Sequence, residues 1–132
     1  MIQEFAVRTQ ARSEFKDITT QVQDAVGRAG IDRGLCQVFV PHTTAGVTIN
    51  ENADPDVTID LIAALDRLVP RDAGYRHREG NSDAHLKASL MGFSVMLPVS
   101  AGRLALGTWQ AVYFCEFDGP RSRRVVITLI DR

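Results

Sequence analysis

The order of the strand and helix patterns limits the fold of this chain more than any other feature of its sequence. From residue 93 onward the pattern is that of β-structure in three runs, Phe93 to Val99, Thr108 to Phe117 and Arg124 to Ile130. Before that point strand and helix patterns are mixed, without the regular alternation that builds a doubly wound parallel sheet. The order therefore predicts an α+β fold in which helices pack on sheet.

Six further patterns come before residue 93. Alternating or continuous apolar residues predict strands at Ile2 to Thr9, Leu35 to Val40 and Ala45 to Asn50. Helical spacing predicts helices at Asp17 to Ala29, Asp54 to Pro70 and Ala84 to Met91. In the second helix we expect one buried stripe, made of Val57, Leu61, Leu65, Leu68 and Val69. The polar stretch between the second and third helices, residues 71–83, is expected to be a functional loop.

Size and charge bound the class of protein. The chain has 132 residues, of which 45% are apolar, so residues 1–132 are expected to form a single domain. Its 15 basic and 16 acidic residues create no positive field that would hold nucleic acid or an anionic membrane. Cys36 and Cys115 lie in apolar runs, and no signal peptide is apparent, so we expect reduced core cysteines in a cytoplasmic protein.

The three histidines all lie near carboxylate or amide residues. His42 follows Pro41 at a strand edge, His77 lies in the polar loop, and His85 falls in the first turn of the third helix. We predict that they converge in one polar pocket. Imidazoles with a carboxylate can hold a first-row metal, and the same groups can act as general acid and base, so the pattern leaves both chemistries open.

Two further patterns concern charge. Asn50 and Glu51 precede the acids Asp54, Asp56 and Asp60, which favour a cation at this helix start or form a solvated cap.

The strand from Thr108 carries Gln110 and Glu116 on one face, about 20 Å apart at ~3.3 Å per residue. We assign Gln110 to the histidine pocket. Arg123 is either an anion clamp or the ion-pair partner of Glu116, and the sequence leaves both open.

Six short motifs are spread over nearly the whole chain. They are His42-Thr43-Thr44-Ala45-Gly46, Asn50-Glu51, Asp54-Pro55, Gly80-Asn81-Ser82-Asp83-Ala84-His85-Leu86, Leu106-Gly107-Thr108-Trp109-Gln110 and Glu116-Phe117-Asp118-Gly119-Pro120-Arg121. Together they resemble the YjbQ family. The resemblance implies an α+β fold with mixed β-sheets in a sandwich-like arrangement, two to three packed helices, and assembly as a homotrimer.

The resemblance also implies an activity. The family is associated with a secondary thiamine-phosphate synthase activity, a transferase reaction that joins a pyrimidine methyl diphosphate to a thiazole phosphate. That reaction needs neutralisation of the diphosphate and shelter for a developing cationic carbon. Two alternatives stay open. One is a metal-dependent hydrolase of a small phosphorylated or carbonyl substrate, and the other is a non-enzymatic trimer that binds a small ligand or metal.

The predicted site is assembled from polar residues in and beside these motifs. The catalytic residues are predicted to be His42, His77, His85, Glu51 and Asp83, and the three histidines are the predicted ligands of a divalent metal, Mg or Zn. The predicted substrate-binding residues are Thr43, Thr44, Asn50, Asn81, Lys87, Trp109, Gln110, Arg123 and Arg124. Among the substrate-binding residues, Lys87 and the two arginines would clamp phosphate, and Trp109 would form an aromatic wall.

Overall fold

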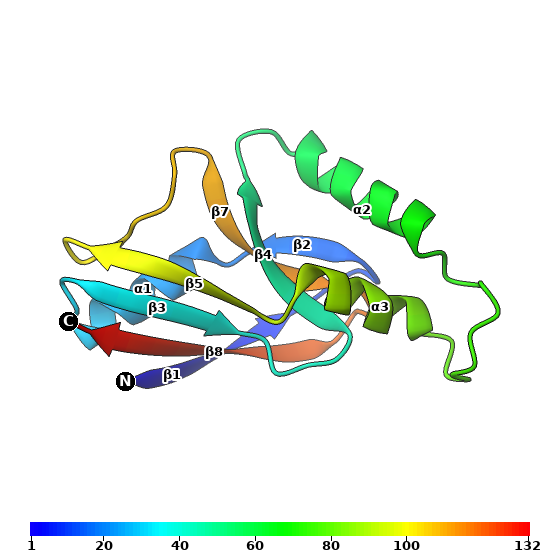
Figure 1. Cartoon of the computed structure of the whole chain (residues 1–132), viewed down its shortest axis with the longest axis horizontal. Helices are drawn as coiled ribbons and strands as arrows, with labels where there is room; N and C mark the ends of the chain where they lie inside the picture. The colour runs from blue at the N-terminus through cyan, green and yellow to red at the C-terminus, as the bar shows by residue number, and fades with distance from the viewer.

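The computed structural model describes all 132 residues and contains three helices and eight strands (Figure 1). The helices are α1 (Thr19–Ala29), α2 (Asp56–Leu68) and α3 (Ser82–Met91). The strands are β1 (Ile2–Arg8), β2 (Glu14–Asp17), β3 (Gly34–Phe39), β4 (Ala45–Glu51), β5 (Ser94–Ser100), β6 (Arg103–Leu104), β7 (Gln110–Glu116) and β8 (Ser122–Asp131). The predicted α+β class is confirmed.

The strands form two sheets. The large sheet has the order β1-β8-β3-β5-β6, and the small sheet has the order β2-β7-β4. Every strand pair is antiparallel, so the expectation of mixed sheets is wrong. The connections explain this. No strand is followed by a helical crossover to a parallel neighbour in its own sheet, which is what a parallel pair requires.

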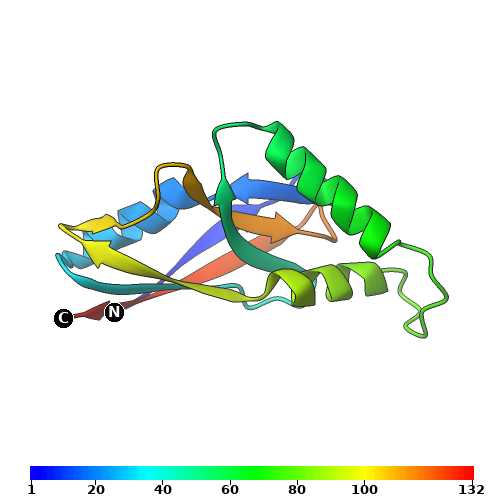
Figure 2. The same cartoon turned by 45° about the horizontal axis from the view of Figure 1, so that its top comes forward.

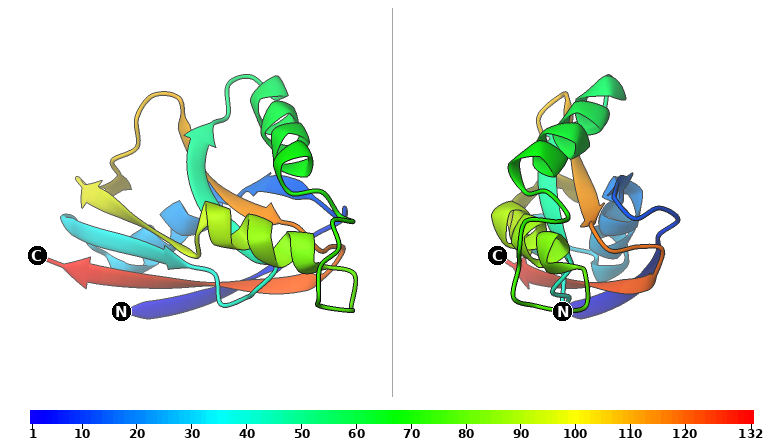
Figure 3. Two further views of the ribbon diagram at one scale, coloured as in Figure 1. Left: turned by 45° about the vertical axis from the view of Figure 1, so that its right-hand side comes forward. Right: turned by 90° about the vertical axis from the view of Figure 1, so that its right-hand side faces the viewer.

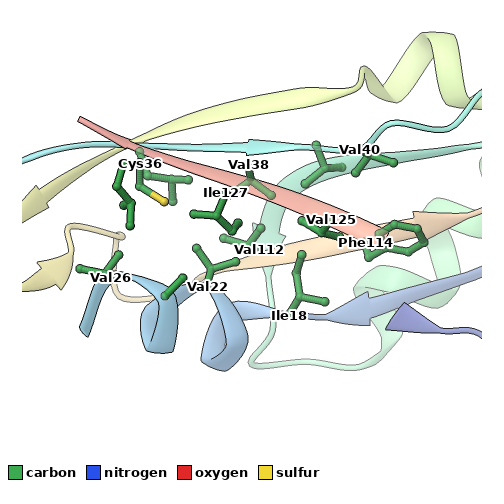
Figure 4. Packing of buried hydrophobic residues seen from close by; sticks show 14 of the residues in the cluster. Ile18, Val22, Val26, Cys36, Val38, Val40, Val112, Phe114, Val125 and Ile127 are labelled. Carbon is green, nitrogen blue, oxygen red and sulfur yellow. The ribbon is translucent and has the colours of Figure 1, made fainter. Parts of the chain in front are cut away.

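The main core lies between the two sheets and is closed on one side by α1 (Figure 4). The large sheet contributes Val38, Val125 and Ile127, and the small sheet contributes Val112 and Phe114, all fully buried. The predicted apolar spacing of the first helix is confirmed. Its buried side chains, Val22, Ala25 and Val26, face this core together with Ile18.

A second, smaller core covers the other face of the small sheet. Ala111, Tyr113, Cys115 and Phe117 point to this side and pack with Leu65 of α2 and with Ala84 and Ala88 of α3. The end-on view in Figure 3 shows α1 and α3 on opposite sides of β4 and β7. The small sheet is therefore buried on both faces, and α3 is fixed against the body of the protein.

Both cysteines are buried and free, as expected for core residues. Burial raises the pKa of the Cys36 thiol to about 11, so this residue stays a neutral core side chain near neutral pH. The longest helix, α2, has 13 residues, and no helix of this protein has both the length and the apolar character to span a membrane.

The predicted buried stripe of α2 is wrong in part. Leu65 and Val69 are buried and Leu61 is partly buried, but Leu68 is 74% exposed. The reason is the position of the helix, which lies along the outer edge of the domain and packs inward through a narrow strip around Leu65 (Figure 2). One apolar flank of α2 is left facing solvent.

Two elements were not predicted, β2 and β6. Glu14 to Asp17 lacks a clear apolar alternation, and pairing with β7 makes it a strand. Asp17, predicted as the helix start, ends β2 instead, yet its Oδ1 still accepts a hydrogen bond from the backbone N–H of Thr19 at 2.9 Å. Long-range pairing thus overrides a weak local pattern.

Gly46 sets how closely α3 approaches the small sheet. The backbone N–H of the next residue, Val47, donates to the carbonyl oxygen of Gly92, just beyond α3, at 3.1 Å. A Cβ atom at Gly46 would lie 2.5 Å from that oxygen. Only glycine fits without movement of α3.

We therefore expect Gly46→Ala to lower the free energy of unfolding by about 1–3 kcal/mol, because overpacking forces the backbone to shift. The matched control is Gly27→Ala in α1, where an added Cβ meets no atom within 4 Å. That variant should gain up to about 1 kcal/mol, since alanine is the better helix former. Urea unfolding measures both, and equal stabilities for the two variants would contradict this packing.

Candidate functional site

Two charged residues of α3 are buried next to each other. Asp83 and Lys87 are 1% and 3% exposed, and lie one helical turn apart. The Nζ atom of Lys87 lies 3.2 Å from Asp83 Oδ2 and 2.6 Å from Oδ1 of Asp66 on α2. Because an unpaired buried charge is costly, this pairing is what allows Lys87 and Asp83 to be buried at all.

Arg12, in the link between β1 and β2, extends the network. Its guanidinium donates to Asp83 Oδ1 at 3.1 Å and to Asp118 Oδ1 at 3.4 Å. Asp118 also accepts from the Asn81 side-chain amide at 2.9 Å and from Arg121 at 2.9 Å. The predicted site residues Asn81, Asp83 and Lys87 are thus brought together, along with the turn that follows β7.

A cavity of about 480 Å³ opens beside this network. Its lining consists of Ala11, Arg12, Ser13, Ile62, Asp66, Arg71, Asp83 and Lys87. We call it the Lys87 cleft. It holds three cationic side chains and two carboxylates, and Arg71 is exposed and makes no ion pair. The surplus of positive charge and the free guanidinium suit a small anionic ligand such as a phosphate ester.

His77 and His85 also meet. Their ring centroids are 5.4 Å apart, with the planes at 82°. They line a separate cavity of about 380 Å³ together with Tyr75, Arg76, Ser82 and Leu86. His85 projects from a different side of α3 than Asp83 and Lys87, so this cavity and the Lys87 cleft flank the same helix.

His42 is held elsewhere. Its Nε2 atom accepts the backbone N–H of Arg124 on β8 at 2.9 Å. Because a backbone N–H can only donate, Nε2 carries no proton in this contact and Nδ1 does. Burial, and the positive charges of Arg123 and Arg124, lower the pKa of His42, which favours this neutral form. His42 therefore fastens the link between β3 and β4 to β8.

The three histidines thus occupy two places in one chain. No three of its His, Cys, Asp and Glu side chains gather into a group that could hold a metal ion. A site that uses all three histidines is not formed within a single subunit.

Arg123 forms a buried ion pair with Glu116. Its Nε donates to Glu116 Oε1 at 2.8 Å, and Nη2 donates to the Thr44 hydroxyl at 2.9 Å. Burial alone would raise the pKa of Glu116, but hydrogen bonds from Arg123, from the backbone of Asp118 and from Thr9 outweigh it and lower the pKa below its ordinary value. Of the two roles that the sequence left open, the ion pair with Glu116 is the one observed.

The remaining predicted residues lie away from the Lys87 cleft. Arg124 pairs with Glu4 on the surface at 3.1 Å, and Thr43 is exposed in the link before β4. Glu51 and Gln110 face each other in the register of β4 and β7, at the end of the small sheet farthest from Glu116. Asn50 and the 63% exposed Trp109 lie next to this pair. Within one chain, the group formed by Glu51, Gln110, Asn50 and Trp109 is therefore separate from Asp83 and Lys87.

Sequence reasoning missed three charged residues of the cleft, Arg12, Asp66 and Arg71. Arg12 and Asp83 are 71 positions apart in the chain, and no local pattern joins them. Asp66 lies near the end of α2, and Arg71 lies at the start of the polar loop. The polarity of that loop was the one sequence signal that could have indicated these two residues. Only the packing of α2 beside α3 shows that Asp66 faces Lys87.

The fold and the cleft define a class of protein, an α+β domain of two antiparallel sheets with a charged cleft beside one helix. Residues 3–132 match the family model described as UPF0047 protein YjbQ-like. This chain belongs to the YjbQ/UPF0047 family.

Relatives of similar length support this membership. The chain is 47% identical over 131 residues to the UPF0047 protein YugU of Bacillus subtilis, with 98% of this chain and 99% of that protein covered. It is 45% identical over 130 residues to a UPF0047 protein of Methanocaldococcus jannaschii, covering 98% and 94%.

Solved structures agree. A crystal structure of an uncharacterized family member from Clostridium acetobutylicum has a TM-score of 0.95 and 52% identity, covering 97% of this chain and 99% of that one. The structure of a hypothetical protein from Aeropyrum pernix also has a TM-score of 0.95, at 36% identity, covering 100% and 99%.

The buried ion pair gives a prediction about stability. Glu116→Gln should lower the free energy of unfolding at pH 7 by about 3–5 kcal/mol, because it leaves Arg123 buried without its charge partner. Since the folded pKa of Glu116 is lowered, the stability it contributes is present above its ordinary value of 4.5 and is lost as pH falls through the folded value.

Chemical denaturation across pH 3 to 8 measures this. The gap between the wild type and Glu116→Gln should narrow as the pH falls below about 4.5. The control is Glu4→Gln, whose carboxylate pairs with Arg124 at the surface and should contribute less than about 1 kcal/mol. A gap of the same size at every pH would rule out a lowered pKa as its source.

Proposed function

We propose that this protein is an enzyme that binds a small phosphorylated substrate in the Lys87 cleft and transfers a group from it. One observation carries the proposal. A cavity of about 480 Å³ presents Arg12, Arg71 and Lys87 together, and Lys87 is buried. A lysine that is held rigidly and shielded from bulk water interacts more strongly with a phosphate than an exposed one does.

The thiamine-phosphate synthase reaction fits this cleft. In that reaction the bond between the methylene carbon and the diphosphate oxygen breaks, and the electron pair leaves with pyrophosphate. The thiazole nitrogen then forms the new bond to that carbon. Negative charge grows on the leaving pyrophosphate, so Arg71, Arg12 and Lys87 would stabilise the transition state more than the ground state.

The carboxylates of the cleft have separate roles in this proposal. Asp83 is buried and neutralised by Arg12 and Lys87, so it positions Lys87 rather than binding an ion. Asp66 pairs with Lys87 through Oδ1, and because its side chain is 58% exposed, its other carboxylate oxygen can reach a ligand. Magnesium binds in proteins through one or two carboxylates together with substrate phosphates, and Asp66 would supply the carboxylate for an ion that accompanies the diphosphate.

Binding of inorganic pyrophosphate tests the cleft without assuming the full substrate. We expect Arg71→Ala to weaken binding at least about tenfold, because a phosphate contact of a charged donor is worth roughly 1.5–3 kcal/mol. Folding should be unaffected, since Arg71 is exposed and unpaired. Isothermal titration calorimetry measures the affinity, and a thermal melt checks the fold.

The control is Arg67→Ala, which removes an exposed arginine near the end of α2 that does not line the cleft. It should bind pyrophosphate like the wild type. Equal loss in both variants would mean that binding follows net charge, and no binding by the wild type would reject the proposal.

We also propose that the protein assembles as a homotrimer through the outer face of the large sheet. No helix covers this face, which is turned to the viewer in Figure 1. Its exposed apolar side chains lie on four neighbouring strands and are Ile2, Leu35, Phe39, Met96 and Ile130. Between them lie the uncharged Gln37 and Thr128. The nearest charges on this face are Glu4 and Arg124, which pair with each other at 3.1 Å. A mainly apolar patch favours other copies of this chain over a charged partner, and around a three-fold axis the patch of each copy would contact its two neighbours.

Light scattering coupled to size-exclusion chromatography tests this interface. Met96→Glu places a charge in the middle of the patch and should convert the trimer to a monomer, because a buried unpaired carboxylate is costly. Leu90→Glu is the control, since Leu90 is a similarly exposed apolar residue on α3. A monomeric wild type, or a Met96→Glu variant that stays trimeric, would contradict the proposal.

A further inference from the structure

We propose that the cavity beside His77 and His85 binds a planar aromatic acid, a ligand that carries one or two flat rings and a single carboxylate. The cavity has a volume of about 380 Å³, within the size range of small-molecule sites. It is separate from the Lys87 cleft, and the proposal does not depend on the phosphate chemistry proposed for that cleft. The lining combines ring, aliphatic, hydroxyl and guanidinium groups, supplied by Tyr75, Arg76, His77, Ser82, His85 and Leu86.

Three of the lining side chains are rings. The imidazoles of His77 and His85 have centroids 5.4 Å apart and planes at 82°. Two rings at right angles offer a third ring both an edge-to-face and an offset-stacked contact, the two arrangements that aromatic pairs prefer. The Tyr75 hydroxyl donates to the carbonyl oxygen of Pro70 at 2.6 Å, which holds the remaining ring in place. A flat ring in this cavity therefore meets aromatic partners that are already positioned.

Leu86 supplies an aliphatic wall to the same cavity. Its side chain is 45% exposed and belongs to neither core. A ligand ring placed against Leu86 would remove apolar surface from water, and that removal is favourable. A bare inorganic anion gains nothing from this wall, so the cavity favours a ligand with an apolar body.

The charge of the lining favours an acid. Arg76 is exposed and forms no ion pair within the chain. Glu79 Oε1 lies 3.8 Å from His77 Nε2, but Glu79 is not among the lining residues. The cavity thus presents a guanidinium and no carboxylate. A guanidinium binds a carboxylate through two parallel hydrogen bonds, and the hydroxyl of Ser82 can donate a further one.

Isothermal titration calorimetry of the intact protein with 2-naphthoate tests the site. The buffer contains EDTA, so that binding depends on the groups of the chain and not on a metal ion. We expect 2-naphthoate to bind, and the saturated decahydro-2-naphthoate to bind at least about threefold more weakly, because it keeps the carboxylate but makes no aromatic contact. The uncharged 2-naphthamide should bind at least about tenfold more weakly, because it loses the charge-assisted pair with Arg76.

Variants locate the ligand in the cavity. Arg76→Gln should weaken 2-naphthoate binding at least about tenfold. The matched control is Arg78→Gln, which removes an exposed arginine of the same loop that does not line the cavity and should leave the affinity unchanged. His85→Ala removes one of the two perpendicular rings and should weaken binding at least about threefold. Arg76 and His85 lie outside both cores, so the melting temperature should change little.

Arg71→Ala separates this cavity from the Lys87 cleft. This variant should lose pyrophosphate affinity and still bind 2-naphthoate like the wild type. The proposal is overturned if the wild type does not bind 2-naphthoate, if the saturated analogue binds as tightly, or if Arg76→Gln and Arg78→Gln lose the same affinity. Loss of 2-naphthoate binding in Arg71→Ala would also overturn it, because the ligand would then occupy the Lys87 cleft.

Discussion

The burial of β7 on both of its faces is the constraint on which the rest of this structure depends. Phe114 and Val112 face the main core between the sheets, while Tyr113, Cys115 and Phe117 face the second core under α2 and α3. A strand buried on both faces cannot slip by one residue without exchanging the two cores, so the register of the small sheet is strongly fixed. Because α3 packs on that sheet, Asp83 and Lys87 are fixed in place as well.

The positions of the buried charged residues follow from this packing. The last buried position of β7 is Glu116, and Arg123 neutralises it from β8 while holding Thr44 of the link before β4. Just beyond β7, Asp118 receives Arg12 and Asn81, and Arg12 continues to Asp83 and so to Lys87. The network connects the core of the fold to the Lys87 cleft. It gives the cleft cations that are preorganised by structure, with Arg71 left free to meet a ligand.

Much of the fold could be predicted from the sequence, and the site only in pieces. Apolar periodicity indicates helix α1 and strands β7 and β8, and all three form close to their predicted bounds. The spacing of Asp83 and Lys87 also shows that they share a helix face. Arg12 and Asp66 carry no such signal, because only tertiary packing brings them to Lys87.

The antiparallel pairing of every strand depends on connections that alternation alone does not reveal. In one chain His42 binds the backbone of β8 while His77 and His85 meet beside α3, because proximity to carboxylates in sequence does not fix direction in space.

A crystal structure of the protein with pyrophosphate and magnesium tests the central claim most directly, because the claim is that the Lys87 cleft is built to receive a phosphorylated ligand. The account predicts density for pyrophosphate inside the cleft, with oxygens within hydrogen-bond distance of Lys87 Nζ and the guanidinium of Arg71. Pyrophosphate bound outside the cleft, for example in the groove between Arg8 and Arg121, with the cleft filled only by water, would contradict it.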